Sequence, residues 1–572
     1  MSSLTRQEQL RLLIDEQQER IRQTFPANRD SAVVALTRAR DWRYLNLQGT
    51  LNAVTKTAPA HNSYLYLSGW HKALQLCFGD AVKPSSVSPL ITDSTLDAWA
   101  DEVLLECDRL SAGEQVLAYC ETGFMRMQQA GQKDFSAWVA SKNMPTEWRE
   151  REDLAWWTNA LARTHEREMQ ELAVEKVSLQ PQLDAFASEW QADGIVYRTT
   201  PEIDDYYMRL GMARVKSMTC HFLYPAQTVI GGCTVELYRN ALAVLIGLAL
   251  KRLDLCRAFV AQHPSSALRA LLAPSYAIDA LTRLLSETLR VESAAIRHVV
   301  DVYSLAHENV SSHYSVASTP APPLLRLGEQ QLVWSLTGLL SEPFLFLTRE
   351  LKRRYSYEYH TASHQHEEVF RQDLYRLFSD KRFVRSAGSV ELRGTQGDLT
   401  TDVDALIFDR KTGALALFEL KSQDPFAYSR QERIRQRDYF HNAGKQVLVC
   451  VQWLNRNGAN ALLTRLDPKL VKRLKAQKTY IFVLGRYLAH FFDGSEFDRR
   501  AAWGTWPQVL RLVNEASFGA EDANPIQSLH NKLMKDTPLA LSSPAPEAQE
   551  IPLGESKVYV YPDFQTYKNW VG

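Results

Sequence analysis

Several features common in proteins are missing from this chain, and each absence excludes a class. The seven cysteines form no Cys-x-x-Cys pair and their number is odd, so neither a zinc ribbon nor a disulfide framework is expected. The longest apolar run, at residues 240–250, ends in Lys251 and Arg252 and is too short to span a bilayer. The N-terminus opens on a charged amphipathic segment instead of a signal peptide. We therefore expect free thiols in a reducing, cytoplasmic setting and no membrane contact.

A net charge is missing as well, since 66 Lys and Arg balance 66 Asp and Glu. The balance does not hold locally. Residues 324–515 contain 30 Lys and Arg against 22 Asp and Glu, and the rest of the chain has the matching acidic surplus. A basic surplus confined to one segment is a modest indication of a polyanionic partner, although chance segregation of charge would give the same count.

The composition is that of a folded chain, with 45% hydrophobic and 23% charged residues. Apolar residues at helical spacing predict helices at residues 4–23, 95–110, 154–177, 234–261, 267–291 and 292–306. A Ser- and Pro-rich stretch at 316–323 is typical of a linker. We therefore predict one or more mainly helical domains at 1–315, a second domain at 324–515 and an extension at 516–572. Within this extension, residues 542–554 have a flexible composition and residues 557–562 could add an edge strand.

A predicted helix at residues 367–378 carries an acidic residue on its apolar side. Phe370, Leu374 and Phe378 form the apolar stripe of this helix, and Glu367 falls within the same stripe. A carboxylate on a buried face costs free energy unless it is paired or bound to a cation. Glu367 is therefore a candidate functional residue.

Two predicted strands, at residues 400–408 and 414–421, follow a first one at 382–387 and flank a loop suited to a hairpin. Alternation along a strand assigns Asp404 to one face with its apolar neighbours, and Glu419 and Lys421 to one face of the next strand. If Asp409 pairs with Ala414, then Asp404 lies opposite Glu419, with Cβ atoms about 5 Å apart. One lysine cannot neutralise two such carboxylates, so we expect a divalent cation, Mg²⁺ or Mn²⁺, between them.

Beyond this hairpin the pattern predicts a helix at 428–442, an apolar strand at 446–454, a helix at 462–477 and a strand at 479–484. Arg430, Arg433 and Arg437 project from one side of the first of these helices and could contact phosphates. A solvated helix face is the alternative interpretation of the three arginines. Asp402 is expected to mark the strand entry or to support the metal ligands by hydrogen bonding.

These residues resemble the PD-(D/E)xK, or restriction-endonuclease-like, nuclease superfamily. The resemblance rests on Asp404, on the Glu419-Leu420-Lys421 tripeptide inside an apolar strand, and on Glu367 in the preceding helix. It implies that Asp404 and Glu419 hold the metal, that Lys421 activates water and stabilises the phosphate, and that Glu367 adds to the metal site. The family's proline before the aspartate is absent here. Gln436 and Tyr439 are candidates for the glutamine and tyrosine of members that process DNA ends, although their spacing is one residue short.

The resemblance implies an α+β chain, with a mainly α-helical N-terminal region followed by an α/β restriction-endonuclease-like domain whose mixed central sheet is flanked by helices. It also implies a Mg²⁺-dependent nuclease that hydrolyses phosphodiester bonds in DNA. The helical region would select the substrate or a protein partner, and analogy suggests defence against foreign DNA. Two alternatives stay open: a non-catalytic nucleic-acid-binding or scaffold protein, and a nuclease that is inactive until a partner binds the helical region.

Overall fold

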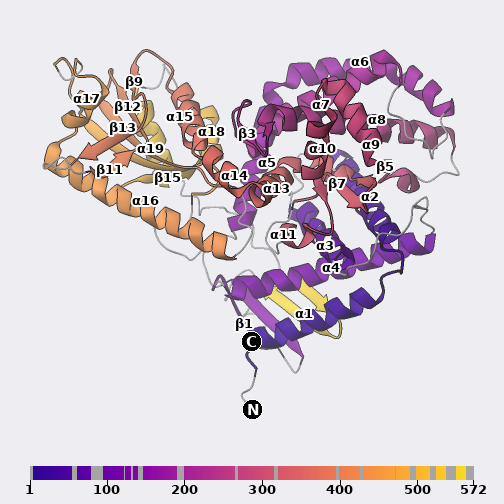
Figure 1. Cartoon of the computed structure of the whole chain (residues 1–572). Coiled ribbons are helices and arrows are strands. Elements are labelled where there is room, and N and C mark those ends of the chain that lie inside the picture. Colours follow the sequence, from indigo (N-terminus) through magenta and orange to yellow (C-terminus); the bar gives the residue numbers. More distant parts are fainter. Residues whose placement is uncertain are drawn as a thin grey trace.

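The computed structural model is a mixed α and β protein in which helices predominate (Figure 1). It describes residues 4–53, 61–78, 94–121, 123–130, 133–139, 146–189, 199–263, 268–314, 320–393, 399–424, 430–469, 472–489, 497–515, 523–535 and 549–561. All seven cysteines are buried as free thiols.

The four N-terminal helices pack together, and the first and fourth of them contact a sheet built from residues 125–139 and 549–561 (lower part of Figure 1). The helices are α1 (Arg6–Gln23), α2 (Arg29–Ala53), α3 (His61–Phe78) and α4 (Ser94–Glu121). The strands are β1 (Met125–Ala130), β2 (Asp134–Val139), β16 (Gln549–Leu553) and β17 (Ser556–Tyr561), in the order β1-β2-β17-β16. The predicted C-terminal edge strand is thus an inner strand, because β17 pairs with β2 on one side and β16 on the other. Residues 549–553 of the segment predicted to be flexible form β16, and residues 542–548 lie outside the described residues.

The middle of the chain forms a second helical group around the buried helix α8. Its elements are α5 (Thr146–Thr164), α6 (Glu166–Glu189), α7 (Pro201–Ser217), η1 (Thr219–His221), β3 (Val229–Ile230), β4 (Cys233–Thr234), α8 (Val235–Gln262), η2 (Leu268–Leu271), β5 (Ser275–Ala277), α9 (Ile278–Leu289), α10 (Ser293–Val302), β6 (Ser304–Leu305), α11 (Val310–His313), β7 (Leu324–Leu327), β8 (Gln331–Trp334), α12 (Leu336–Leu340), α13 (Pro343–Arg354) and α14 (Ser356–Ser363). Glycines let α7 and α8 cross closely, since a Cβ on Gly247 would lie 2.4 Å from the Tyr207 carbonyl oxygen. Of the described helices, none is both long and apolar enough to cross a membrane.

A small sheet in this group, ordered β5-β8-β7-β6, runs across the predicted linker. Leu324 of β7 pairs in parallel with Ser304 of β6, and β8 returns to pair with β5. Residues 320–323 are buried, and residues 315–319 lie outside the described part. Residues 320–323 therefore lie in a buried connection that leads into β7, which differs from the predicted linker, because prolines are also tolerated where a strand begins.

The C-terminal group is a five-stranded mixed sheet with helices on both faces (upper left of Figure 1). Its elements are α15 (Gln365–Leu377), β9 (Phe383–Arg385), β10 (Val390–Arg393), β11 (Leu399–Val403), β12 (Ala405–Asp409), β13 (Ala414–Lys421), α16 (Arg430–Asn457), α17 (Asn460–Leu466), β14 (Lys478–Gly485), β15 (Ala502–Thr505), α18 (Trp506–Glu515) and α19 (Pro525–Lys535). The strand order is β15-β14-β13-β12-β9, in which β14 is parallel to β13 and β12 is antiparallel.

The alternation of side chains on β13 separates two cores, and every residue of this strand is buried. Ala416, Phe418 and Leu420 belong to the core on the α15, α18 and α19 side. Leu415 and Leu417 belong to the core on the α16 and α17 side. Glu419 and Lys421 have the same parity as these two leucines, so they lie on the face that α16 covers.

Three secondary-structure predictions for this group were wrong. The apolar segment 446–454 is the second half of α16, because Phe440, Val447 and Cys450 are buried at helical spacing. The helix predicted at 462–477 ends at Leu466 as α17. The strand predicted at 400–408 is two strands, β11 and β12, which belong to different sheets and meet at Asp404.

Candidate active site

The β12–β13 hairpin has the register expected from the sequence. Ala405 pairs with Phe418 and Phe408 with Leu415, so the next step of the ladder sets Asp404 opposite Glu419. Gly413, with φ of 71°, closes the turn by donating its N–H to the Asp409 carbonyl at 2.9 Å. Asp404 Oδ2 accepts a hydrogen bond from the Leu420 N–H at 2.6 Å. The break between β11 and β12 therefore turns the Asp404 carboxylate toward the β13 backbone.

The two carboxylates are buried and destabilise each other's charge. Asp404 and Glu419 are each 6% exposed. Burial raises the pKa of Asp404 most, and the charges of Glu419 and Glu367 raise it further. Burial likewise raises the pKa of Glu419, and Asp402 and Glu367 add to this rise. The cluster therefore contains more negative charge than its surroundings balance.

Lys421 is the cation within this cluster. Its Nζ donates to Glu419 Oε1, and to Gln446 Oε1 on α16 at 3.0 Å. The ammonium also lies 4.9 Å from the ring centroid of Tyr439, which is half-exposed. Burial opposes the charged form of Lys421, but Glu419, Tyr439 and Asp404 together outweigh burial and the pKa of the lysine rises. Gln446 was missed at the sequence level because it falls in the segment predicted to be a strand.

Glu367 lies near the cluster but not on a buried face, which corrects the prediction from its helical stripe. Its side chain is 44% exposed, and it accepts a hydrogen bond from Arg371 one turn further along α15. Arg371 also pairs with Glu368 and donates its Nε–H to the Asp404 carbonyl at 2.6 Å. Arg371 therefore links α15 to the site. It fixes the backbone at Asp404 and partly neutralises the charge of Glu367.

Of the predicted phosphate-binding arginines, Arg433 and Arg437 lie on the side of α16 that faces away from the carboxylates. Arg433 is buried and pairs with Glu150 of α5 at 3.0 Å, so phosphate cannot reach it. Arg437 is partly buried and pairs with Asp438. The side chain of Arg430 lies outside the described residues. For Arg433 the prediction is wrong, because helical spacing identifies a face without showing what that face packs against.

A different arginine has the orientation expected of a phosphate contact. Arg435, Tyr439 and Gln446 fall within about 40° of one another at about 100° per residue. Tyr439 and Gln446 both contact Lys421, and Arg435 is exposed. Arg435 thus extends the stripe of α16 that lines the carboxylate cluster. The spacing of 435, 439 and 446 was visible in the sequence, but it carried meaning only once Lys421 had been placed beneath α16.

The helical region grips the end of β13. Asp424, three residues after Lys421, accepts from the Tyr359 hydroxyl at 2.6 Å and from Lys352 Nζ at 3.4 Å. Its carbonyl accepts from Gln436 Nε2 at 3.3 Å, which places Gln436 in this contact and not beside the carboxylates. Lys352 also reaches Glu432 of α16. Helices α13 and α14 therefore touch the segment that leaves the site.

The donor set suits a hard divalent cation held with help from a substrate. Asp404 Oδ1 and Glu419 Oε2 have no hydrogen-bond donor among the described residues. Within the same residues, no three His, Cys, Asp or Glu side chains converge as a complete metal site. Mg²⁺ is commonly held by one or two carboxylates, with waters and substrate phosphates completing the shell. Two carboxylates with an unbalanced negative charge fit a Mg²⁺ ion that is completed by waters and substrate phosphates. They do not fit a site in which the protein supplies every ligand.

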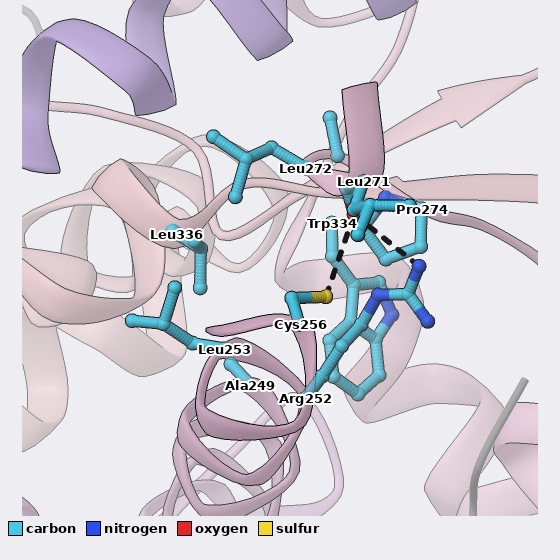
Figure 2. Close-up of a pocket in the computed structure, with 10 residues that line it drawn as sticks. Ala249, Arg252, Leu253, Cys256, Leu271, Leu272, Pro274, Trp334 and Leu336 are labelled. Carbon is cyan, nitrogen blue, oxygen red and sulfur yellow. Dashed lines mark hydrogen bonds between the residues drawn. The ribbon is translucent and has the colours of Figure 1, made fainter. Parts of the chain in front are cut away.

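Two cavities elsewhere offer weaker sites. The one in Figure 2, lined by Cys256, Trp334 and Leu336, has a volume of about 10 Å³, which suffices for about one water. A larger one of about 290 Å³ lies between α7, α8 and α9. Two polar groups of its lining already have partners, since Lys251 pairs with Asp204 and Tyr207 donates to Asp254.

Comparison of the chain with family models, curated proteins and solved structures finds no match. The geometry of the carboxylate cluster is therefore the basis on which a function can be proposed.

Proposed function

We propose that the chain is a metal-dependent nuclease with a restriction-endonuclease-like C-terminal domain, and that its substrate is DNA. One observation carries the proposal: two buried, opposed carboxylates share a face with a single lysine, and the pKa of both is raised. A protein that used this cluster only for stability would gain by replacing one carboxylate with an apolar residue. An unbalanced buried charge is therefore more consistent with a site completed by a ligand.

The residues divide the work according to their positions. Asp404 and Glu419 would hold Mg²⁺ or Mn²⁺, which supplies charge neutralisation at the phosphate and acidifies an attacking water. Lys421 presents a positive charge beside both carboxylates, where it would bind an oxygen of the scissile phosphate. Glu367, which Arg371 holds at the exposed side, would orient water at the mouth of the site. Arg435 would contact a neighbouring phosphate of the same strand.

A nuclease restrained by its helical region is the second candidate, and the contacts at Asp424 favour it. Tyr359 and Lys352 hold the segment directly after Lys421, and Lys421 itself is only 7% exposed. Release of this grip by a partner would open the site to DNA. In that case Lys352→Met would raise cleavage, whereas a purely supportive contact would make the same variant slower.

Cleavage assays on purified full-length protein test the proposal. Supercoiled and linear DNA are incubated with Mg²⁺, Mn²⁺ or EDTA, beside Asp404→Asn and Glu419→Gln. Loss of one metal-binding carboxylate should lower the rate by roughly 100-fold or more. Glu391→Gln is the matched control, since Glu391 is an exposed carboxylate on β10 that pairs with Arg393. Cleavage that survives EDTA, or that persists in both site variants, would show that the activity lies elsewhere.

A further inference from the structure

Exposed basic side chains from three segments meet at the end of the five-stranded sheet farthest from the carboxylates. We call this surface the basic end. It consists of Lys381 before β9, Arg410 and Lys411 in the β12–β13 turn, and Lys475 and Lys478 at the start of β14. Lys472 and Arg473 are exposed next to Lys475 in the chain.

Backbone contacts hold these segments side by side. The Arg410 N–H donates to the Arg382 carbonyl at 3.1 Å, and its guanidinium donates to the Lys381 carbonyl at 3.4 Å. On the other side, the Gln477 N–H donates to the Gly413 carbonyl at 2.8 Å, and Lys478 is the ladder partner of Ala414. The turn, the start of β9 and the start of β14 therefore form one continuous surface.

The described acidic residues leave most of the charge of the basic end unneutralised. Within the described part of the chain, none of its five side chains forms an ion pair with an acidic residue. The nearest carboxylate in sequence, Asp409, is fully buried and bonded to Arg382 and Thr412. Asp380 is exposed next to Lys381 and accepts from the Arg382 N–H, so it offsets at most one of the five positive charges. Clustered like charges repel one another, so this surface costs free energy unless an anion binds it.

The spacing between the basic end and the carboxylates is set by one strand. β13 runs for eight residues from Ala414 at the basic end to Lys421 at the site. Seven steps of about 3.3 Å give a separation of about 23 Å. This corresponds to about seven base pairs of duplex, at 3.4 Å per pair. A stiff polyanion could hold both contacts at once, whereas a short flexible anion could not.

We propose that the basic end is a second, remote contact for the phosphate backbone of double-stranded nucleic acid, about seven base pairs from the position that is cut. This proposal rests on the proposed function in one respect. The direction of the duplex, from the carboxylates to the basic end, assumes that the carboxylates are the cleavage site. It adds a substrate preference to that function: a duplex long enough to span the whole sheet binds more tightly than one that covers the site alone.

The test measures binding without cleavage, as fluorescence anisotropy of a labelled DNA duplex of about 20 base pairs in EDTA over a series of salt concentrations. The double variant Lys411→Ala, Lys475→Ala should lower the slope of log affinity against log salt by about two, one for each lost phosphate contact. The matched control is Lys133→Ala, Lys557→Ala, which removes the same charge from exposed lysines of the β2–β17 sheet. This control should keep the wild-type slope.

Equal slopes for the wild type and the Lys411, Lys475 variant would overturn the proposal, as would an equal loss in the Lys133, Lys557 control. An unchanged urea midpoint in both variants shows that neither slope reflects unfolding. Cleavage of DNA in Mg²⁺, measured on the wild type and on Glu419→Gln, separates this inference from the proposed nuclease activity. If the wild type binds DNA through the basic end but does not cleave it, the proposed nuclease activity is wrong and the remote contact is supported. If the wild type cleaves DNA but the salt dependence of its affinity does not change when the two lysines are replaced, the nuclease activity is supported and the remote contact is wrong.

Discussion

Glu350 on α13 and Glu419 on β13 are both buried glutamates, yet their surroundings act on their charge in opposite directions. Burial opposes the charge of Glu350, but hydrogen bonds from Arg353 and His313 outweigh it and hold the pKa of this carboxyl well below its usual range. Its Oε2 accepts from His313 Nε2 at 2.7 Å, and Asn309 and Arg354 add further donors. Glu419 has Lys421 as its hydrogen-bonded cation, and its pKa is raised.

The difference teaches how to tell a structural charge from a functional one. At Glu350 the surrounding hydrogen-bond donors and cations fully balance the negative charge. The cluster joins α13 to α11 and requires no ligand. Glu419 and Asp404 have too few cations and hydrogen-bond donors around them to balance their negative charge. A bound cation would relieve this repulsion. Four predictions test this contrast.

The largest effect is expected where the balance is complete. Glu350→Gln removes the charge that Arg353, Arg354 and His313 surround, and should lower the free energy of unfolding by about 4 kcal/mol. Urea denaturation followed by circular dichroism measures this loss. The control Glu171→Gln removes an exposed carboxylate paired with Arg167 and should change stability by no more than about 0.5 kcal/mol. A Glu350 variant as stable as this control would break the comparison.

Arg433 should behave like Glu350 and not like Arg435. Arg433→Gln removes the buried charge that pairs with Glu150 and should cost about 3 kcal/mol of unfolding free energy. Arg435→Gln should leave stability within about 0.5 kcal/mol, because its side chain is exposed. The same pair of variants should reverse in DNA binding, where only Arg435→Gln weakens affinity directly. Loss of binding without loss of stability in Arg433→Gln would show that the two arginines are assigned the wrong way round.

His221 gives a pH-dependent version of the contrast. Burial lowers the pKa of this histidine to about 4, and its Nε2 is bonded to Thr158 at 2.8 Å. The unfolded chain takes up a proton near pH 6.5 and the folded chain does not, so stability is present at higher pH and falls as pH drops from about 6.5 toward 4. The lost stability should reach about 3 kcal/mol. His221→Gln should have a flatter stability-versus-pH profile than the wild type, so the difference in free energy of unfolding between the two proteins should change between pH 6.5 and 4. Parallel profiles would refute the assignment.

The smallest effect is expected at the unbalanced cluster, and its sign is opposite. Asp404→Asn removes one of two repelling charges while its side-chain oxygen can still accept from Leu420, so metal-free protein should gain about 1 kcal/mol. Mg²⁺ should raise the melting temperature of the wild type but not of this variant. Differential scanning fluorimetry in EDTA and in Mg²⁺ gives both readings. An equal Mg²⁺ response in the two proteins would mean that the cation binds elsewhere.

Local sequence reasoning succeeded where one turn and one alternation decide the outcome. The residues 410–413 close a hairpin, and the register that opposes Asp404 to Glu419 follows from that turn. It failed where long segments had more than one partner available. The segment 446–454 is apolar enough for a strand, but its buried residues repeat at helical spacing and complete α16.

The sequence alone determined the parity of Asp404, Glu419 and Lys421, because strand pleating and a tight turn are local properties. Only the tertiary structure decided which groups surround them. Arg371 reaches the Asp404 carbonyl from α15, Gln446 and Tyr439 reach Lys421 from α16, and Arg433 is lost to Glu150 of α5. These partners come from other elements, so their contacts depend on how helices pack across the sheet, and no spacing along one segment encodes that packing.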